Sequence, residues 1–279
     1  MTSLVPVREI AHLRLALPQH DRWVEDLTWI PASPTEIHLA SRFYPIAIRL
    51  EDQEPRLGLL VGQRYLAHAL LNSAGKWRGA YRPVGLRCFP FQAPDIADNP
   101  LSDILIDADS EYLSPISGAL LIDGTLQPSR MLTELHRLFS LLKHGQQSLA
   151  GVLDQYLIGG LLVPLTDGDA PVQDRGQPLY IINPARFAHM ENAGLAAMAR
   201  HDFLSVDVAI ACQFSLQNLR PEYRPKDAGH YGRQGTEPAM LAMDTTMIDD
   251  LSLVLDDGEL ISVADIDVMR VAHRPEPVV

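Results

Sequence analysis

The residues best suited to bind a ligand lie in one short stretch, residues 75–91, which we call the basic-aromatic segment. It combines cationic side chains with aromatic rings, and the candidate binding residues are Lys76, Trp77, Arg78, Tyr81, Arg82 and Arg87. An arginine guanidinium binds carboxylates and phosphates through paired hydrogen bonds and also stacks on aromatic rings. The segment therefore favours recognition of an anionic or aromatic group. The alternative is a structural turn, in which the rings anchor the chain and the arginines pair with nearby carboxylates.

The charge of this segment is opposite to that of the whole chain. The 279 residues include 23 Lys and Arg against 35 Asp and Glu, which gives a net charge of −12. Residues 76–87 contain four basic side chains and no acidic one. Because phosphate backbones and anionic lipids repel an acidic protein, we expect no nucleic-acid partner and no membrane partner. A protein, a peptide or a small ligand is the expected partner.

Familiar catalytic patterns are missing from the sequence. It contains no Gly-x-Ser-x-Gly elbow, no phosphate-binding Gly-x-x-x-x-Gly-Lys loop and no His-Glu-x-x-His. The run Asp107–Glu111 begins like a calcium loop, but Tyr112 stands where such a loop needs glycine. The two cysteines, Cys88 and Cys212, are too few for a cysteine-rich zinc site. We therefore predict no metal site, and the catalytic residues and cofactors stay unknown.

The elements around the segment predict an α+β fold. Apolar runs over 44–50, 57–61 and 65–71, separated by turns, predict an antiparallel sheet region. Before them, Ser33-Pro34-Thr35-Glu36 has the order of a capping box and predicts the start of a short helix.

Helical periodicity dominates the middle of the chain. Apolar residues recur at helical spacing over 131–143 and again over 149–157, and His144-Gly145 separates the two runs. This pattern predicts an αα-hairpin whose second helix ends at Gly159-Gly160. Residues 204–219 are apolar on nearly every face, which predicts a buried helix.

Composition changes near residue 224. Residues 220–238 are rich in proline, glycine and charge, and residues 251–263 place Asp256-Asp257-Gly258 between two apolar runs, which predicts a β-hairpin tail. We therefore predict a domain over 1–223 and a linker with a β-hairpin appendage over 224–279. No apolar run is long enough to cross a membrane, and the N-terminus lacks the pattern of a secretory signal, so we expect a soluble, cytoplasmic protein.

The order of several short motifs carries a family resemblance. Tyr44-Pro45-Ile46, Gly75-Lys76-Trp77, Tyr81-Arg82-Pro83 and Phe89-Pro90-Phe91 follow one another as in the SapC family of bacterial proteins, which the chain resembles over roughly residues 3–220. The resemblance implies a link to surface-layer secretion loci, and to halogenase-like and oxygenase-like neighbours as partners. It brings no established catalytic residues.

We expect a cytoplasmic accessory protein of a bacterial surface-layer or nutrient-uptake system. It would bind a protein or peptide partner, or a small anionic or aromatic ligand, through the basic-aromatic segment. Two alternatives stay open. One is an enzyme that modifies a peptide or amino-acid side chain, with or without a metal, at a site assembled from distant His and Asp residues. The other is a homo-oligomeric scaffold that uses residues 224–279 as an exchanged arm.

Overall fold

The computed structural model describes residues 3–78, 81–123, 125–191, 194, 196, 198 and 203–225. The α+β class is confirmed, with helices and several antiparallel sheets. The predicted β-hairpin at 251–263 lies outside the described residues, as does nearly all of the predicted appendage over 224–279. The boundary near residue 224 therefore stays a prediction.

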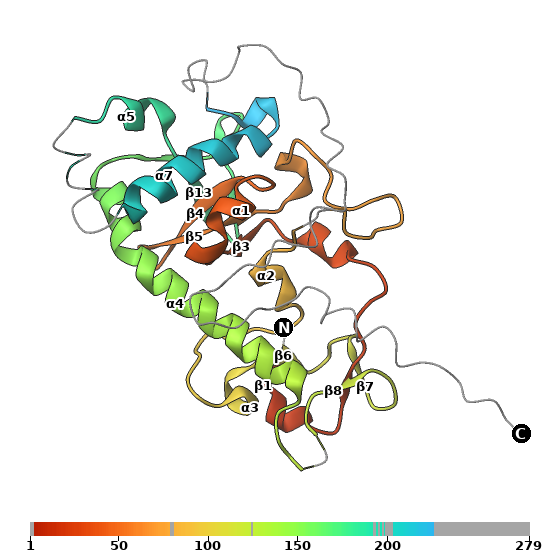
Figure 1. The fold of residues 1–279 in the computed structure, drawn as a ribbon. Helices are drawn as coiled ribbons and strands as arrows, with labels where there is room; N and C mark the ends of the chain where they lie inside the picture. The colour runs from red at the N-terminus through yellow and green to blue at the C-terminus, as the bar shows by residue number, and fades with distance from the viewer. Residues whose placement is uncertain are drawn as a thin grey trace, which may run out of the picture. The chain divides into compact units, whose positions relative to one another are not determined.

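A six-stranded antiparallel sheet lies at the centre of the fold (Figure 1). Its strands are, in order, β12 (Gln173–Asp174), β13 (Gln177–Ile182), β4 (Ile46–Glu51), β5 (Glu54–Leu60) and β3 (Trp29–Pro31), and β9 (Leu162–Pro164) also pairs with β13. A two-residue turn at Asp52 and Gln53, both with positive φ, joins β4 to β5. The third predicted strand, 65–71, is wrong. β3 occupies the free edge of β5, and residues 65–71 form only isolated bridges at Leu66 and Leu71.

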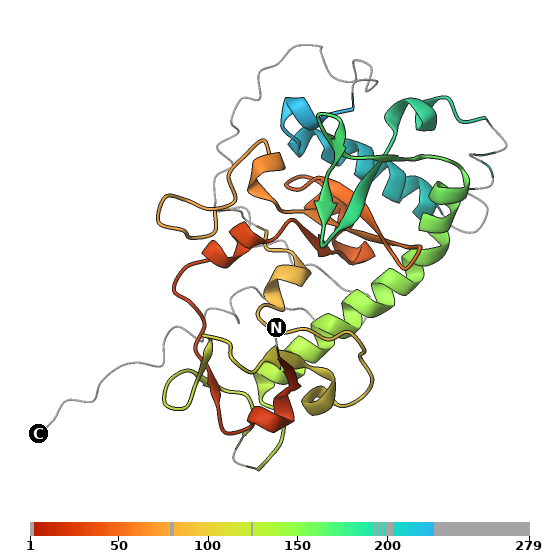
Figure 2. The same ribbon diagram turned by 180° about the vertical axis from the view of Figure 1, so that it is seen from behind.

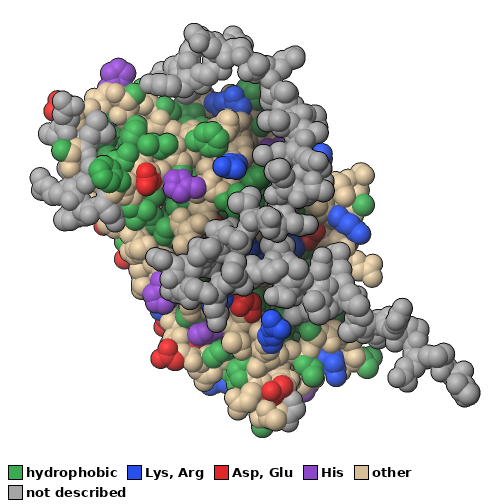
Figure 3. Space-filling view, in the orientation of Figure 1, with side chains coloured by type: hydrophobic (Ala, Val, Ile, Leu, Met, Phe, Trp, Pro, Cys, Tyr) green, Lys and Arg blue, Asp and Glu red, His purple; other side chains and the backbone are tan. Residues whose placement is uncertain are grey.

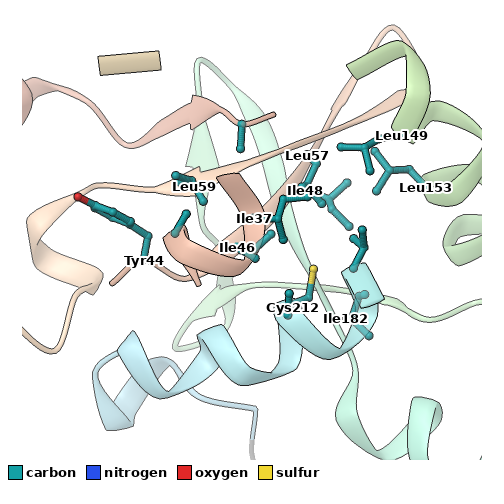
Figure 4. Close-up of a cluster of buried hydrophobic side chains, with 14 of the residues drawn as sticks. Ile37, Tyr44, Ile46, Ile48, Leu57, Leu59, Leu149, Leu153, Ile182 and Cys212 are labelled. Carbon is teal, nitrogen blue, oxygen red and sulfur yellow. The ribbon is translucent and has the colours of Figure 1, made fainter. Parts of the chain in front are cut away.

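Successive side chains along a strand point to opposite faces of the sheet, and here both faces are apolar. Side chains of one face form the main core together with α1 (Ile37–Ala40), α4 (Arg130–Ile158) and α7 (Leu204–Ser215). Figure 4 shows Ile46, Ile48, Leu57 and Leu59 of this face beside Leu149, Leu153 and Cys212. The alternate residues, Ala47, Leu60, Leu179 and Ile181, face the other side and pack with Trp29, Tyr65, Leu216 and Leu219. In the view from behind, the strands lie in front of α7 (Figure 2).

The predicted αα-hairpin is wrong, because α4 is one continuous helix of 29 residues. Gly145, predicted to end the first helix, lies in mid-helix against the Ser33-Pro34 turn, where an added Cβ would come within 2.6 Å of Pro34 Cδ. The next residue, Gln146, is buried and hydrogen-bonds to both backbone groups of Leu57, at 3.2 Å and 2.7 Å. Gly145 thus allows close packing and does not end the helix. The predicted stop at Gly159-Gly160 is confirmed, with Gly160 at φ +62°.

The N-terminal half of α4 packs on a second core. This core gathers around two small antiparallel sheets, made of β1 (Leu4–Pro6) with β6 (Leu105–Asp107), and of β2 (Arg14–Leu15) between β7 (Leu113–Ser114) and β8 (Ala119–Leu120). Leu132 and Leu135 of α4 contribute to it, whereas Leu149 and Leu153 belong to the main core. One helix therefore joins both cores.

Helix α7 is buried on one side only, which corrects the prediction of a helix buried all round. Val208, Ala211 and Cys212 face the core, but Ile210 is 54% exposed and Phe214 is 51% exposed. Figure 3 shows hydrophobic side chains gathered over α7, at the upper left. The helix lies on one face of the sheet, so only one stripe can be covered. Within the described ranges, no helix combines the length and the apolar composition needed to cross a membrane.

Candidate ligand-binding site

The first part of the basic-aromatic segment is one arm of a narrow hairpin. The Asn72 N–H donates to the Lys76 carbonyl at 2.9 Å, the Arg78 N–H donates to the Leu70 carbonyl at 2.8 Å, and Gly75 takes a positive φ in the turn. Side chains alternate along an extended arm. Trp77 is accordingly half-buried, whereas Lys76 and Arg78 on either side of it are exposed.

Asp21 fastens this hairpin to the turn before η2 (Arg22–Asp26). Its backbone N–H donates to the Gly75 carbonyl at 2.7 Å, and its Oδ2 accepts a hydrogen bond from the backbone N–H of Trp77 at 2.9 Å. Its Oδ1 accepts a hydrogen bond from Arg82, with which it forms an ion pair. The Arg82 guanidinium lies 5.6 Å from the Trp23 ring and 5.5 Å from the Trp77 ring. Arg82 is thus neutralised and stacked within the protein.

Glu36 fastens the second part of the segment. This carboxylate is only 4% exposed; its Oε1 accepts the Ser33 N–H at 3.0 Å, as the predicted capping box requires. Its Oε2 accepts the Tyr81 hydroxyl at 2.6 Å and the Val84 N–H at 3.0 Å. Burial, followed by the nearby Glu36 charge, raises the pKa of Tyr81 well above its usual range. The phenol therefore stays protonated and donates to Glu36.

Three cations of the segment point outward. Lys76, Arg78 and Arg87 are exposed, and no carboxylate of the described residues lies within ion-pair distance of them. Arg87 uses its Nε to donate to the Arg82 carbonyl at 2.8 Å, and its guanidinium lies 5.6 Å from the Tyr81 ring. Its two terminal nitrogens have no hydrogen-bond acceptor among the described residues and can donate to a ligand.

The predicted site residues thus divide into two groups. Trp77, Tyr81 and Arg82 make contacts inside the protein, as the structural-turn alternative expects, and Lys76, Arg78 and Arg87 are presented to solvent. A ligand-binding role for any of the six stays a prediction. Trp77 Nε1 and Arg82 Nε are buried with no hydrogen-bond acceptor among the described residues. Two donors without acceptors in one network favour an additional acceptor close to the rings.

Sequence reasoning missed the two carboxylates that hold the segment. The capping-box motif identified Glu36 as a local helix-start residue, but not its bonds to Tyr81 and Val84. Asp21 has no sequence signal at all, because its partner Trp77 lies 56 residues away.

Three further side chains with reactive groups, Cys88, Cys212 and His136, are buried or paired within the fold. Cys88 and Cys212 are buried, and burial raises the pKa of each thiol to about 12. Such thiols stay protonated and are poor nucleophiles. His136 Nε2 lies 3.3 Å from Asp103 Oδ2, a contact that ties α3 (Pro100–Asp103) to α4. Across the described residues, no three His, Cys, Asp or Glu side chains are grouped so as to hold a metal ion.

Comparison with known proteins identifies a family. A family model described as SapC matches residues 8–221, well over half of the chain. This range includes the central sheet, α4, α7 and the basic-aromatic segment. No curated protein and no solved structure matches the chain.

Proposed function

The chain belongs to the SapC family, and from that premise we propose that it is a binding protein that recognises an acidic segment of a partner protein or peptide. Lys76, Arg78 and Arg87 would make the contacts. In line with the family resemblance, we place the protein in the cytoplasm, as an accessory protein of a bacterial surface-layer or nutrient-uptake system. Its partners there would include halogenase-like or oxygenase-like proteins.

One observation carries this proposal: three exposed cations lie close together in the sequence of an acidic protein, without a carboxylate partner among the described residues. Some other basic side chains of the described residues pair with the protein's own acidic ones; Arg49 and Arg56 do so with Glu51. At physiological salt the Debye length is about 8 Å, so the local charge matters more to an approaching carboxylate than the net −12.

The contacts beneath the three cations favour binding as well. Asp21 holds the backbone at Gly75 and Trp77, and Glu36 holds it at Val84, so little conformational entropy is lost at these points when a partner binds. Each arginine offers a planar fork of donors that matches a carboxylate, and Lys76 adds a point charge.

The test compares two triple variants of equal charge. The first carries Lys76→Gln, Arg78→Gln and Arg87→Gln, and the control carries Arg8→Gln, Arg42→Gln and Arg175→Gln at exposed sites elsewhere. A fluorescein-labelled oligo-glutamate peptide is titrated with each protein by fluorescence anisotropy. The first variant should bind at least about tenfold more weakly than the unmodified chain, and the control should bind within about twofold of it.

A second measurement uses host lysate, in which the tagged chain and both variants capture proteins that mass spectrometry identifies. The proposal expects a partner with an acidic segment to be lost from the first variant alone. Equal capture and equal peptide affinity for all three proteins would overturn it.

A further inference from the structure

The sheet edge next to β13 is interrupted by a small hairpin. Val172 donates to the Leu165 carbonyl at 2.8 Å, and both residues hydrogen-bond to Leu179 of β13, so the edge closes up at this point. Residues 166–171 therefore leave the sheet as β10 (Thr166–Asp167) paired with β11 (Ala170–Pro171). The turn between them contains Gly168 with a positive φ.

This hairpin forms one wall of a cleft of about 490 Å³. The opposite wall comes from η2 and from η4 (Gln63–Tyr65), and the polar lining residues include Glu25, Thr28, Arg64, Asp167 and Gln173. The volume falls within the range of small-molecule sites. None of these residues belongs to the set proposed above to bind a partner.

Charges of both signs line the cleft. Arg64 Nη2 lies 2.7 Å from Asp167 Oδ2, and the guanidinium stacks on the Tyr65 ring at 4.5 Å. The Arg64 side chain is nevertheless 62% exposed, so it can still donate to a ligand. Glu25 is exposed and has no ion-pair partner in the part of the chain that the structure describes. The cleft thus offers one cation that is already oriented and two carboxylates.

We propose that this cleft binds a small zwitterion, namely a free α-amino acid or a short peptide. Arg64 would receive the carboxylate, and Glu25 with Asp167 would receive the ammonium group. A ligand with only negative charge would be repelled by both carboxylates, and a ligand with only positive charge would offer Arg64 no acceptor. A molecule that carries both a carboxylate and an ammonium group can pair with Arg64 and with the two carboxylates at once.

The experiment uses the full chain and calorimetric titration with the free L-amino acids, one at a time, and with diglycine. Any ligand that binds is then tested as its N-acetyl form, which lacks the ammonium group, and as its amide, which lacks the carboxylate. The proposal expects at least one amino acid or diglycine to bind, and each blocked form to bind at least about tenfold more weakly. The titrations with free amino acids and the titration with diglycine distinguish a free amino acid from a peptide as the natural ligand.

Variants assign the binding to the cleft. Arg64→Met removes the partner of the ligand's carboxylate and should remove most of the affinity for the zwitterion. Glu25→Gln removes one partner of the ammonium group and should weaken binding of the same zwitterion. The matched controls are Arg56→Met and Glu54→Gln, an exposed ion pair on β5 outside the cleft, and neither should change the affinity. The proposal is overturned if no zwitterion binds, if blocked forms bind equally well, or if Arg64→Met and Glu25→Gln have no more effect than the controls.

Discussion

At the scale of single residues, two carboxylates determine the conformation of the basic-aromatic segment. Asp21 accepts hydrogen bonds from a backbone N–H and from Arg82, and Glu36 accepts them from two backbone N–H groups and from Tyr81. A carboxylate can accept several such bonds at once because it has two oxygens. The exposed cations therefore depend on these two carboxylates for their position.

Replacement of Glu36 by glutamine tests this dependence. The amide keeps one acceptor oxygen, but its NH₂ group faces a donor that is left without a partner, so the free energy of unfolding should fall by about 1–3 kcal/mol. Urea unfolding followed by circular dichroism measures the change. The control is Glu54→Gln, which alters an exposed pair with Arg56 and should change stability by about 0.5 kcal/mol or less. Equal losses in both variants would contradict the role given to Glu36.

The sequence predicts contacts between neighbouring residues better than contacts between residues far apart in the chain. The capping box lies within four neighbouring residues, so its pattern was readable and Glu36 was assigned to it. The contacts of Asp21 join positions 56 and 61 residues apart, and composition carries no trace of such pairing. The segment itself was found because its four basic side chains contrast with an acidic chain.

At the scale of elements, α4 shows how one residue type supports two interpretations. A glycine within a helical pattern can end the helix or permit a close approach, and local sequence does not distinguish the two. Gly145 meets the Ser33-Pro34 turn and continues the helix, whereas Gly160 adopts a positive φ and ends it. The predicted hairpin failed at Gly145 because tertiary packing decided its role. The prediction of a fully buried α7 failed for a related reason, since apolar composition alone does not say how many sides are covered.

Two glycines of α4 give a matched pair of substitutions with opposite expected signs. In Gly145→Ala the new methyl group meets Pro34 Cδ at 2.6 Å and Ser33 Oγ at 2.9 Å, so stability should fall by about 1–3 kcal/mol. In Gly151→Ala nothing lies within 4 Å of the new Cβ, and the better helix propensity of alanine should raise stability by about 0.5–1 kcal/mol. Thermal unfolding of both variants measures the difference. Stabilisation by Gly145→Ala would show that no close approach exists there.

At the scale of the described molecule, α4 connects two hydrophobic cores. With a rise of about 1.5 Å per residue, its 29 residues extend about 43 Å. Leu132 and Leu135 are buried in the core around the small sheets, and Leu149 and Leu153 in the core of the central sheet. Because the helix is continuous between these two sets of residues, its formation at one core supports its formation at the other, and the two cores should unfold together.

The substitution Leu135→Ala tests this coupling. It removes a buried side chain from the second core and should cost about 2–4 kcal/mol. All three tryptophans, Trp23, Trp29 and Trp77, belong to or pack against the cores around the central sheet. Tryptophan fluorescence and far-ultraviolet circular dichroism should therefore shift to the same lower denaturant midpoint. Two separate midpoints in the variant would show that the cores unfold independently.

The interrupted strand beside β13 has a further consequence, for solubility. A long flat edge strand is a template on which a second chain can add its own strand, and repeated addition leads to fibrils. Here the hairpin at 166–171 splits that edge into β9 and β12, pieces of three and two residues. At the opposite edge β3 has only three residues, and its Pro31 has no N–H to offer. The hairpin at 166–171, which forms one wall of the cleft, therefore also protects the sheet from aggregation through strand pairing.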